Sequence, residues 1–475
     1  MVPEDEAIRN IDNDPYRVPP IAKQRISKSK RFFRWKLVVA IFGIPILAVS
    51  VFVFGLRVLY TARESMGRTE MHRRIELLRE KELPVDQESL QAKYINETSD
   101  RETEAWNEIL SNLDSQEFKA SYDGVPNFDP QIDDIQFNME GDWQYENKAI
   151  AFTVRWKEMV KSVQRLASKE EVVGFSIRFK SLDTELKSVD QLRWLARMIH
   201  LDGLLSLRQG DSMRTRRDIE CLFELSKIAS RIPFSPAMLA SVSFELQGFE
   251  LIRNGLEWNQ LAEQDLIALL PTISRGLSIG ARWSDVMKAE LGTAVPIFVK
   301  PNLGMKINTR VPSRGYDCIA YLNLMERALD LDTADFDNLL TGARKLESDL
   351  RKLHSGVLPA MDHILVGILA PAFEAYAEVF VELASTHRLA VIAIKTRLLK
   401  EQEGRFPNSL SELETIGDQW QPIGGKPFGY EVRGEHAVLW GFQLKEYSAC
   451  PESPPSTIGE TRMAKKNREW IWVMK

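Results

Sequence analysis

LVVAIFGIPILAVSVFVFGL, residues 37–56, is a run of twenty residues without an ionisable side chain. A helix rises about 1.5 Å per residue, so a helix of this length spans about 30 Å, the thickness of the hydrocarbon core of a bilayer. The sequence therefore predicts a transmembrane helix at Leu37–Leu56, with the lipid bilayer as its partner.

A cleaved signal peptide is the alternative interpretation of this run, because Ala48-Val49-Ser50 has the small-x-small form of a cleavage site. However, the charged segment before the run is 36 residues long, and apolar residues continue through Val51–Phe54. Both features favour an uncleaved signal-anchor.

Positive charges flank the apolar run unequally. Seven Lys and Arg residues precede it between residues 23 and 36 with no acid among them, whereas five arginines follow it between residues 57 and 74, interspersed with Glu64 and Glu70. Cationic segments are retained on the cytoplasmic side during insertion. We therefore expect a single-pass protein of the cell membrane with a cytoplasmic N-terminus and an extracytoplasmic C-terminal domain.

Composition narrows the class of partner and cofactor. Residues 1–36 hold nine of the 62 Lys and Arg and five of the 67 Asp and Glu, which leaves residues 37–475 with a net charge of −9. Nucleic acid is not an expected partner, because phosphate binding needs a basic face. Cys221, Cys318 and Cys450 form no CxxC pair, so we expect neither a metal nor a disulfide framework, and no cofactor motif is present. The first two cysteines lie in predicted helices as buried apolar fillers.

The segments beside the predicted anchor differ in pattern. Residues 1–36 lack periodicity and predict a disordered cytoplasmic tail. Residues 57–84 predict a helical stalk, with Met71, Ile75 and Leu78 on one face. That face either pairs with another subunit or, more economically, docks on the chain's own domain.

Residues 85–385 predict a helical extracytoplasmic domain, in which apolar residues recur at helical spacing. Ser235-Pro236 is typical of a helix start, and Pro371 predicts a kink. The stretch 292–313, rich in Pro and Gly, predicts an exposed loop. Two faces are expected to pack inside the domain: Leu239, Val242, Leu246 and Phe249, and Leu339, Ala343, Leu346, Leu350 and Leu353.

Residues 114–147 interrupt this pattern and are rich in acids and aromatics, including Asp123, Asp129, Tyr122, Phe128 and Trp143. Clustered carboxylates are typical of calcium sites, and exposed rings stack on sugars, but the EF-hand spacing is absent. The favoured interpretation is a solvated connecting segment.

The sequence pattern changes again in residues 386–475, from helical spacing to short strand-like segments. Gly404 predicts the end of a helix, and strands are expected at 427–433, 436–442 and 469–474, with the first two joined by a turn at Gly434-Glu435. A small α+β module follows from this order.

The motifs of this module are "GRFP" at 404–407, a short helix at 409–416, and "GKPFGY" at 425–430. The module resembles the soluble half of type II secretion pseudopilins, and the whole chain resembles a group of uncharacterised bacterial single-pass proteins. The likeness covers about the last ninety residues, and no pseudopilin processing site precedes the anchor. The resemblance implies a shared fold element and not a filament subunit.

One catalytic pattern is present, at Gly276-Leu277-Ser278-Ile279-Gly280. G-x-S-x-G is the nucleophile elbow of serine hydrolases, which needs a strand before it. Leu266, Leu269 and Ile273 instead predict a helix there, so Ser278 is expected in a turn between helices.

The expected function is that of a non-catalytic, membrane-anchored scaffold of the envelope or of secretion, which binds protein through its helical surface. A membrane-tethered serine hydrolase using Ser278 is the alternative, and a single-pass sensor is a further one. No catalytic, cofactor-binding or metal-binding residue is assigned in the favoured interpretation.

Overall fold

The apolar run is helical where the structure describes it. The computed structural model describes residues 44–95, 100–129, 132, 141, 143–169, 172–180, 184–275, 279–300, 314–355, 363–413, 428–441 and 471–475. Helix α2 (Ile44–Glu80) includes the described part of the apolar run and most of the predicted stalk. The chain forms two compact units, Met1–Arg63 and Glu64–Lys475.

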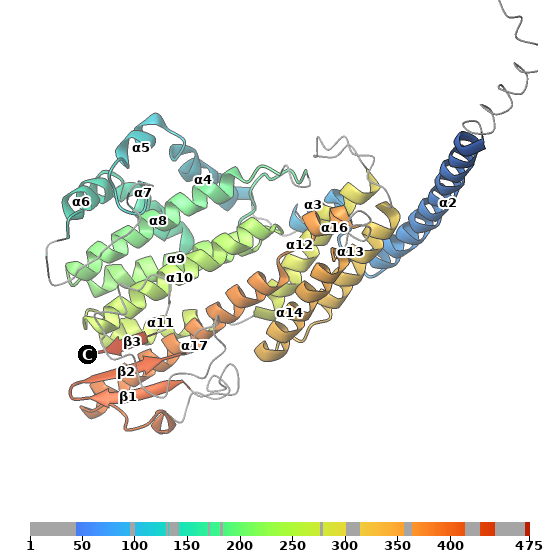
Figure 1. Ribbon diagram of the computed structural model, residues 1–475. Coiled ribbons are helices and arrows are strands. Elements are labelled where there is room, and N and C mark those ends of the chain that lie inside the picture. The colour runs from blue at the N-terminus through green and yellow to red at the C-terminus, as the bar shows by residue number, and fades with distance from the viewer. Residues whose placement is uncertain are drawn as a thin grey trace, which may run out of the picture. The chain divides into compact units, whose positions relative to one another are not determined.

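The unit Glu64–Lys475 is mainly α-helical and carries a short antiparallel sheet of three strands (Figure 1). Its smaller helices are α3 (Gln87–Ile95), α4 (Asp100–Asn112), α5 (Gln116–Ser121), α6 (Glu146–Arg155), α7 (Lys157–Ala167), α11 (Glu263–Arg275) and α16 (Ile364–Leu369). The longer ones are α8 (Lys187–Arg208), α9 (Ser212–Ser230), α10 (Ser235–Glu257), α12 (Ile279–Val299), α13 (Arg314–Leu329), α14 (Phe336–Leu353) and α17 (Phe373–Glu403).

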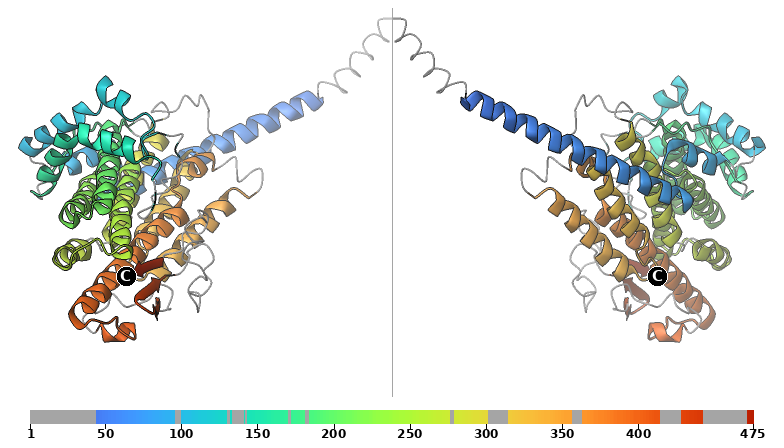
Figure 2. Two further views of the ribbon diagram at one scale, coloured as in Figure 1. Left: turned by 90° about the vertical axis from the view of Figure 1, so that its left-hand side faces the viewer. Right: turned by 90° about the vertical axis from the view of Figure 1, so that its right-hand side faces the viewer.

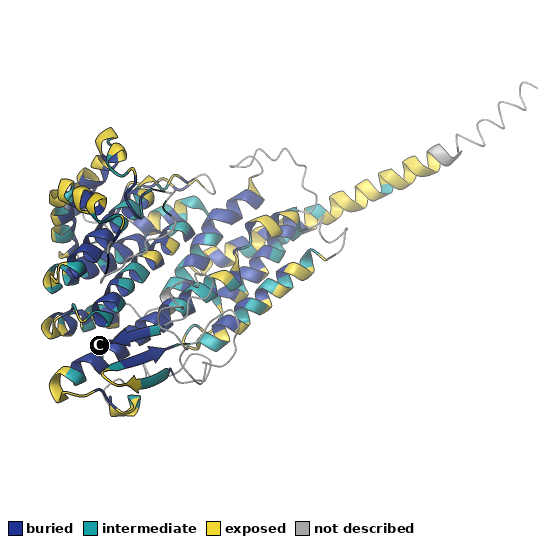
Figure 3. Ribbon diagram, turned by 60° about the vertical axis from the view of Figure 1, so that its left-hand side comes forward, coloured by how far each residue is buried: buried dark blue, intermediate teal, exposed yellow. Residues whose placement is uncertain are grey.

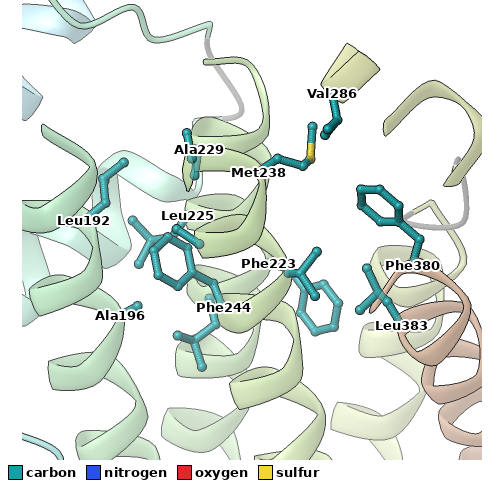
Figure 4. Close-up of a cluster of buried hydrophobic side chains, with 14 of the residues drawn as sticks. Leu192, Ala196, Phe223, Leu225, Ala229, Met238, Phe244, Val286, Phe380 and Leu383 are labelled. Atoms are coloured by element: carbon teal, nitrogen blue, oxygen red, sulfur yellow. The ribbon is translucent and has the colours of Figure 1, made fainter. Parts of the chain in front are cut away.

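Helices α8, α9 and α10 pack side by side and form the centre of the core. The turn before α9 is built by Gly210, which has φ +68°, and by Asp211, whose carboxylate accepts the Arg214 N–H. Phe244 of α10 and Leu225 of α9 lie next to each other, with α8 on one side and α17 on the other (Figure 4). These side chains are almost fully buried, so this layer holds the neighbouring elements in place.

Helix α17 is a core helix that contacts α10, α11 and α14. Pro371 separates it from α16, as the predicted kink requires, because proline cannot donate a helical hydrogen bond. Among the described residues, Ile364–Glu403 is the one helical stretch with the length and apolar composition of a membrane span. Phe373, Phe380 and Ile392 are fully buried, so packing inside the unit accounts for this apolarity, as expected for a core helix.

The three-stranded sheet follows α17. Gly404 ends the helix with φ +71°, and β1 (Gly429–Arg433) pairs with β2 (His436–Trp440) through the predicted turn at Gly434. Strand β3 (Ile471–Met474) pairs with β2 and contacts α10 and α17, and the sheet lies beside α17 in both views of Figure 2. The predicted order of helix and antiparallel strands is confirmed, while the boundary at 385/386 falls within the continuous helix α17.

The predicted stalk face docks on its own unit. Met71, Ile75 and Leu78 are buried in the core, as the more economical interpretation expected. Close to them the backbone of α2 approaches α13, because a Cβ added at Gly315 would lie 2.3 Å from the Gly67 carbonyl carbon. The missing side chain permits this contact.

We expect Gly315→Ala to destabilise the unit by about 1–3 kcal/mol, because the added methyl meets backbone atoms that cannot rotate away. Thermal unfolding of the full chain in detergent measures the change. Gly55→Ala is the matched control, since a Cβ at this α2 position has nothing within 4 Å. Equal unfolding temperatures for the two variants would contradict the close packing of α2 on α13.

The predicted exposed loop at Gly292–Ser313 is wrong in its first part. Helix α12 runs to Val299 with Pro296 inside it, and Val295, Ile297 and Phe298 are buried. Burial of these side chains outweighs the helical hydrogen bond that the proline removes. Residues 301–313 lie outside the described part of the chain.

The described part of 114–147 is not a solvated connection. Phe118, Phe128 and Trp143 are buried, and the Tyr122 and Trp194 rings stack with centroids 5.2 Å apart. The buried rings contradict an exposed sugar platform, because they fill the space between α5, α6 and α8. Asp129 accepts the Gly124 N–H, so it stabilises a turn.

Two details of α10 also differ from expectation. Its N-cap residue is Phe234, whereas the Ser235 hydroxyl donates to Glu290 of α12. Leu239 is 39% exposed and lies off the buried face that Val242 and Phe249 share. The first turns of α10 are nevertheless held in the core by Ala237, Met238 and Ala240, which are buried.

Candidate functional site

A largely buried polar network lies between α9, α10, α12 and α17. Its centre is the Glu245 carboxylate, which is 2% exposed. The Ser226 hydroxyl donates to Oε1 at 2.6 Å, and Arg282 donates to the same oxygen. His387 Nε2 lies 2.7 Å from Oε2.

The histidine of this network is held on both sides. His387 Nδ1 lies 3.1 Å from the Ile273 carbonyl oxygen, which can only accept a hydrogen bond, so Nδ1 is the donor. The Phe249 ring packs against it edge-on, with centroids 4.6 Å apart. His387 therefore connects α11 and α17 to the carboxylate on α10.

Burial alone would raise the pKa of Glu245, but the charge of Arg282 and the hydrogen bonds from His387 and Ser226 oppose it and lower the pKa to about 2. The carboxylate is therefore ionised in the folded unit. Serine, glutamate and histidine follow in that order, whereas a hydrolase triad places the histidine next to the serine. This geometry supports a role of Glu245 in packing and electrostatics.

A lowered pKa makes stability depend on pH in one direction. The contribution of Glu245 is complete above its ordinary pKa of 4.5 and is lost as the pH falls toward about 2. We expect the urea midpoint of the full chain to fall across this window, and the fall to be shallower in Glu245→Gln. Equal slopes for the two proteins would show that the network does not hold the carboxylate ionised.

A cleft of about 890 Å³ opens beside this network, and Glu245 and Arg282 form part of its wall. Helices α7 and α9 supply most of the remaining wall. The charged residues of the lining are Lys161, Arg165, Arg216, Arg217, Lys227 and Arg282 against Glu220, Glu224 and Glu245. Cations therefore outnumber carboxylates two to one, in a chain that is acidic beyond residue 36.

The cations of the cleft differ in how far they are neutralised. Lys161 lies 2.7 Å from Glu158, and Lys227 lies 3.1 Å from Glu224. Arg216 Nε lies 3.5 Å from the Asp265 carboxylate and 3.7 Å from the Glu220 carboxylate. Arg165 and Arg217 have no carboxylate within 4 Å among the described residues; their contacts are with Ser162 Oγ and Met213 Sδ. Among the described residues, no hydrogen-bond acceptor contacts Arg282 Nη1, which is buried.

Cys221 lines the cleft, and Asp218 contacts Gln164 of the lining. Burial raises the pKa of the Cys221 thiol well above its ordinary value, which keeps it from acting as a thiolate. Burial also raises the pKa of Asp218, with a further contribution from the nearby Asp202, and Gln164 donates to Asp218 at 2.6 Å.

The alternative hydrolase interpretation depends on Ser278 of the Gly276–Gly280 motif. Ser278 is outside the described residues, but the residues before it form α11 and those after it form α12. A helix therefore occupies the place where a nucleophile elbow requires a strand. Cys318 is buried, as expected, and no group of three or more His, Cys, Asp or Glu residues in the described part of the chain is arranged to hold a metal.

The sequence patterns described above do not predict the network or the cleft, although the sequence contains one feature of each. Glu245 lies three residues after Val242 and four before Phe249, so helical spacing places a carboxylate on an otherwise apolar face. The segment RTRR at 214–217 is a cationic cluster in an acidic chain. Neither signal identifies the partners on α7, α12 and α17, which only the fold brings near.

Comparison with protein-family models, with curated proteins and with solved structures finds no match to this chain. The residues and their geometry are therefore the basis for assigning a function.

Proposed function

We propose that this chain is a non-catalytic, single-pass membrane protein that serves as a scaffold of the envelope or of secretion. The observation that carries the proposal is the exposure of apolar side chains along α2 (Figure 3). Leu47, Phe52 and Phe54 are 65%, 66% and 68% exposed, and Val49, Val51, Val53, Leu56, Val58 and Leu59 are also exposed. A soluble surface rarely presents such a continuous apolar face.

A bilayer is the environment that suits this helix best. Each large apolar side chain gains about 1.5–3 kcal/mol on leaving water, so nine neighbouring ones would stabilise insertion strongly. Arg57 and Tyr60 follow the run at the level where cationic and aromatic side chains reach the lipid headgroups. The excess of positive charge before the run favours a cytoplasmic N-terminus, with Glu64–Lys475 on the other side of the membrane.

Protein binding is the activity we propose for the helical unit. Glu64–Lys475 presents several separate exposed apolar residues, including Val154, Met213 and Ile267. We propose that α17 and the C-terminal sheet are related in fold to the pseudopilin module. The sheet packs on α17, and its strand β3 also contacts α10 within the same unit. A unit of this kind suits assembly with other envelope proteins.

Crosslinking in intact membranes tests the scaffold. We expect a lysine-reactive crosslinker to connect the unit reproducibly to a small set of envelope proteins, and a variant lacking residues 1–56 to lose them. A full-length protein that stays in the membrane and yields no reproducible partner would contradict the scaffold while leaving the anchor intact.

A further inference from the structure

We propose that the cleft between α7, α9, α10 and α12 binds a small molecule that carries at least two phosphate or carboxylate groups. The proposal goes beyond membrane anchoring, because it concerns a site inside Glu64–Lys475. Three arginines of the cleft wall support the proposal. Arg165 and Arg217 line the cleft and have no carboxylate within 4 Å among the described residues, and Arg282 is held in the wall by Glu245.

The charge of the cleft is the first reason. Six cations and three carboxylates line about 890 Å³, and Glu245 is already engaged by Arg282, His387 and Ser226. Lys161, Arg216 and Lys227 lie near carboxylates, so the uncompensated positive charge of the cleft comes from Arg165 and Arg217. A concave site lined by uncompensated charge concentrates the potential and attracts ions of the opposite sign, so this cleft favours an anion.

The kind of cation is the second reason. Four of the six are arginines, whose planar guanidinium groups bind phosphate and carboxylate through paired hydrogen bonds. Arg282 Nη1 is a buried donor that has no hydrogen-bond acceptor among the described residues, and a buried donor without an acceptor is costly. An anionic oxygen entering beside α12 would supply that acceptor.

The size and the walls of the cleft set the class of ligand. Small-molecule sites occupy about 300–1,000 Å³, and this cleft falls within that range. Phe223 and Ala167 add apolar surface to the lining, which suits a carbon skeleton between the anionic groups. A nucleic acid strand needs a basic face of much greater extent, and beyond residue 36 the chain is acidic.

The position of Arg282 is fixed before any ligand arrives. Its guanidinium is tied to the buried Glu245 carboxylate, and its side chain is 13% exposed. A preorganised donor costs little conformational entropy on binding. Arg165 and Arg217 are exposed at the mouth, where they would close on the ligand from α7 and α9.

Pyrophosphate and citrate are the probes, added to the full chain in detergent at constant ionic strength. We expect at least one of them to raise the unfolding temperature and to bind in calorimetry, with sodium chloride at equal ionic strength having no such effect. Binding of pyrophosphate alone assigns a phosphate ligand, and binding of citrate alone assigns a carboxylate ligand. Failure of both anions would overturn the proposal.

Charge reversal locates the binding. Arg165→Glu combined with Arg217→Glu is expected to raise the dissociation constant of the anion by more than about tenfold, since two cations of the cleft become anions. Arg351→Glu, an exposed arginine of α14 outside the lining, is the matched control and should bind like the unaltered chain. Circular dichroism checks that both variants fold. Undiminished binding in the double variant would place the anion elsewhere and overturn the assignment, whatever the outcome for membrane anchoring.

Discussion

Glu245→Gln is expected to lower the free energy of unfolding by about 3–5 kcal/mol. The substitution keeps the shape of the side chain but removes the negative charge between Arg282 and His387, and an uncompensated charge in a protein interior costs about this much. The shift of the Glu245 pKa from 4.5 to about 2 gives a similar value of about 3 kcal/mol. Urea unfolding of the full chain at neutral pH measures the loss.

Two further variants distinguish the effect of removing the Glu245 charge from a general loss of stability on substitution. Adding Arg282→Met to Glu245→Gln removes the unpaired cation, so we expect the double variant to recover part of the lost stability. Glu158→Gln removes an exposed carboxylate paired with Lys161, and it should leave the urea midpoint unchanged. If Glu245→Gln unfolded at the same urea concentration as the unaltered chain, the network would not stabilise the core.

Val49→Arg combined with Phe52→Arg is expected to release the protein from the membrane. Each arginine near the centre of a membrane helix costs about 2.5–3.5 kcal/mol of insertion free energy, so the pair costs about 6 kcal/mol. Both residues are exposed on α2, so the change should not disturb the folded unit. The fraction of protein that remains in the pellet after alkaline carbonate extraction measures the effect.

Met66→Arg is the matched control for this pair. Met66 lies on the same helix, is 62% exposed, and follows the apolar run by ten residues, so the control adds a charge outside the predicted span. We expect it to remain in the carbonate pellet with the unaltered chain. Equal release of both variants would indicate that charge on α2 acts in some other way than by opposing insertion.

Local chemistry made several parts of the fold predictable. Gly404 ends α17 because glycine adopts positive φ without strain, and Pro371 interrupts the helical run because it lacks an N–H group. The turn at Gly434 lies between two stretches of alternating residues, and these stretches form the predicted hairpin. Each of these features depends on one or two neighbouring residues.

Other parts depend on contacts between segments far apart in the chain. Pro and Gly in 292–299 are typical of a loop, but tertiary burial of Val295 and Phe298 keeps them helical. The rings of Phe118, Tyr122 and Phe128 pack together because Trp194 of α8 lies against them. Glu245 and His387 are 142 positions apart, and no short pattern links such a pair.

The most direct test of membrane anchoring is protease treatment of sealed, right-side-out vesicles that carry the full chain with a different tag at each end. We expect protease to remove the C-terminal tag, while the N-terminal tag stays protected in the membrane pellet with a fragment that includes α2. Protection of the C-terminal tag, or recovery of the intact chain in the supernatant, would contradict it.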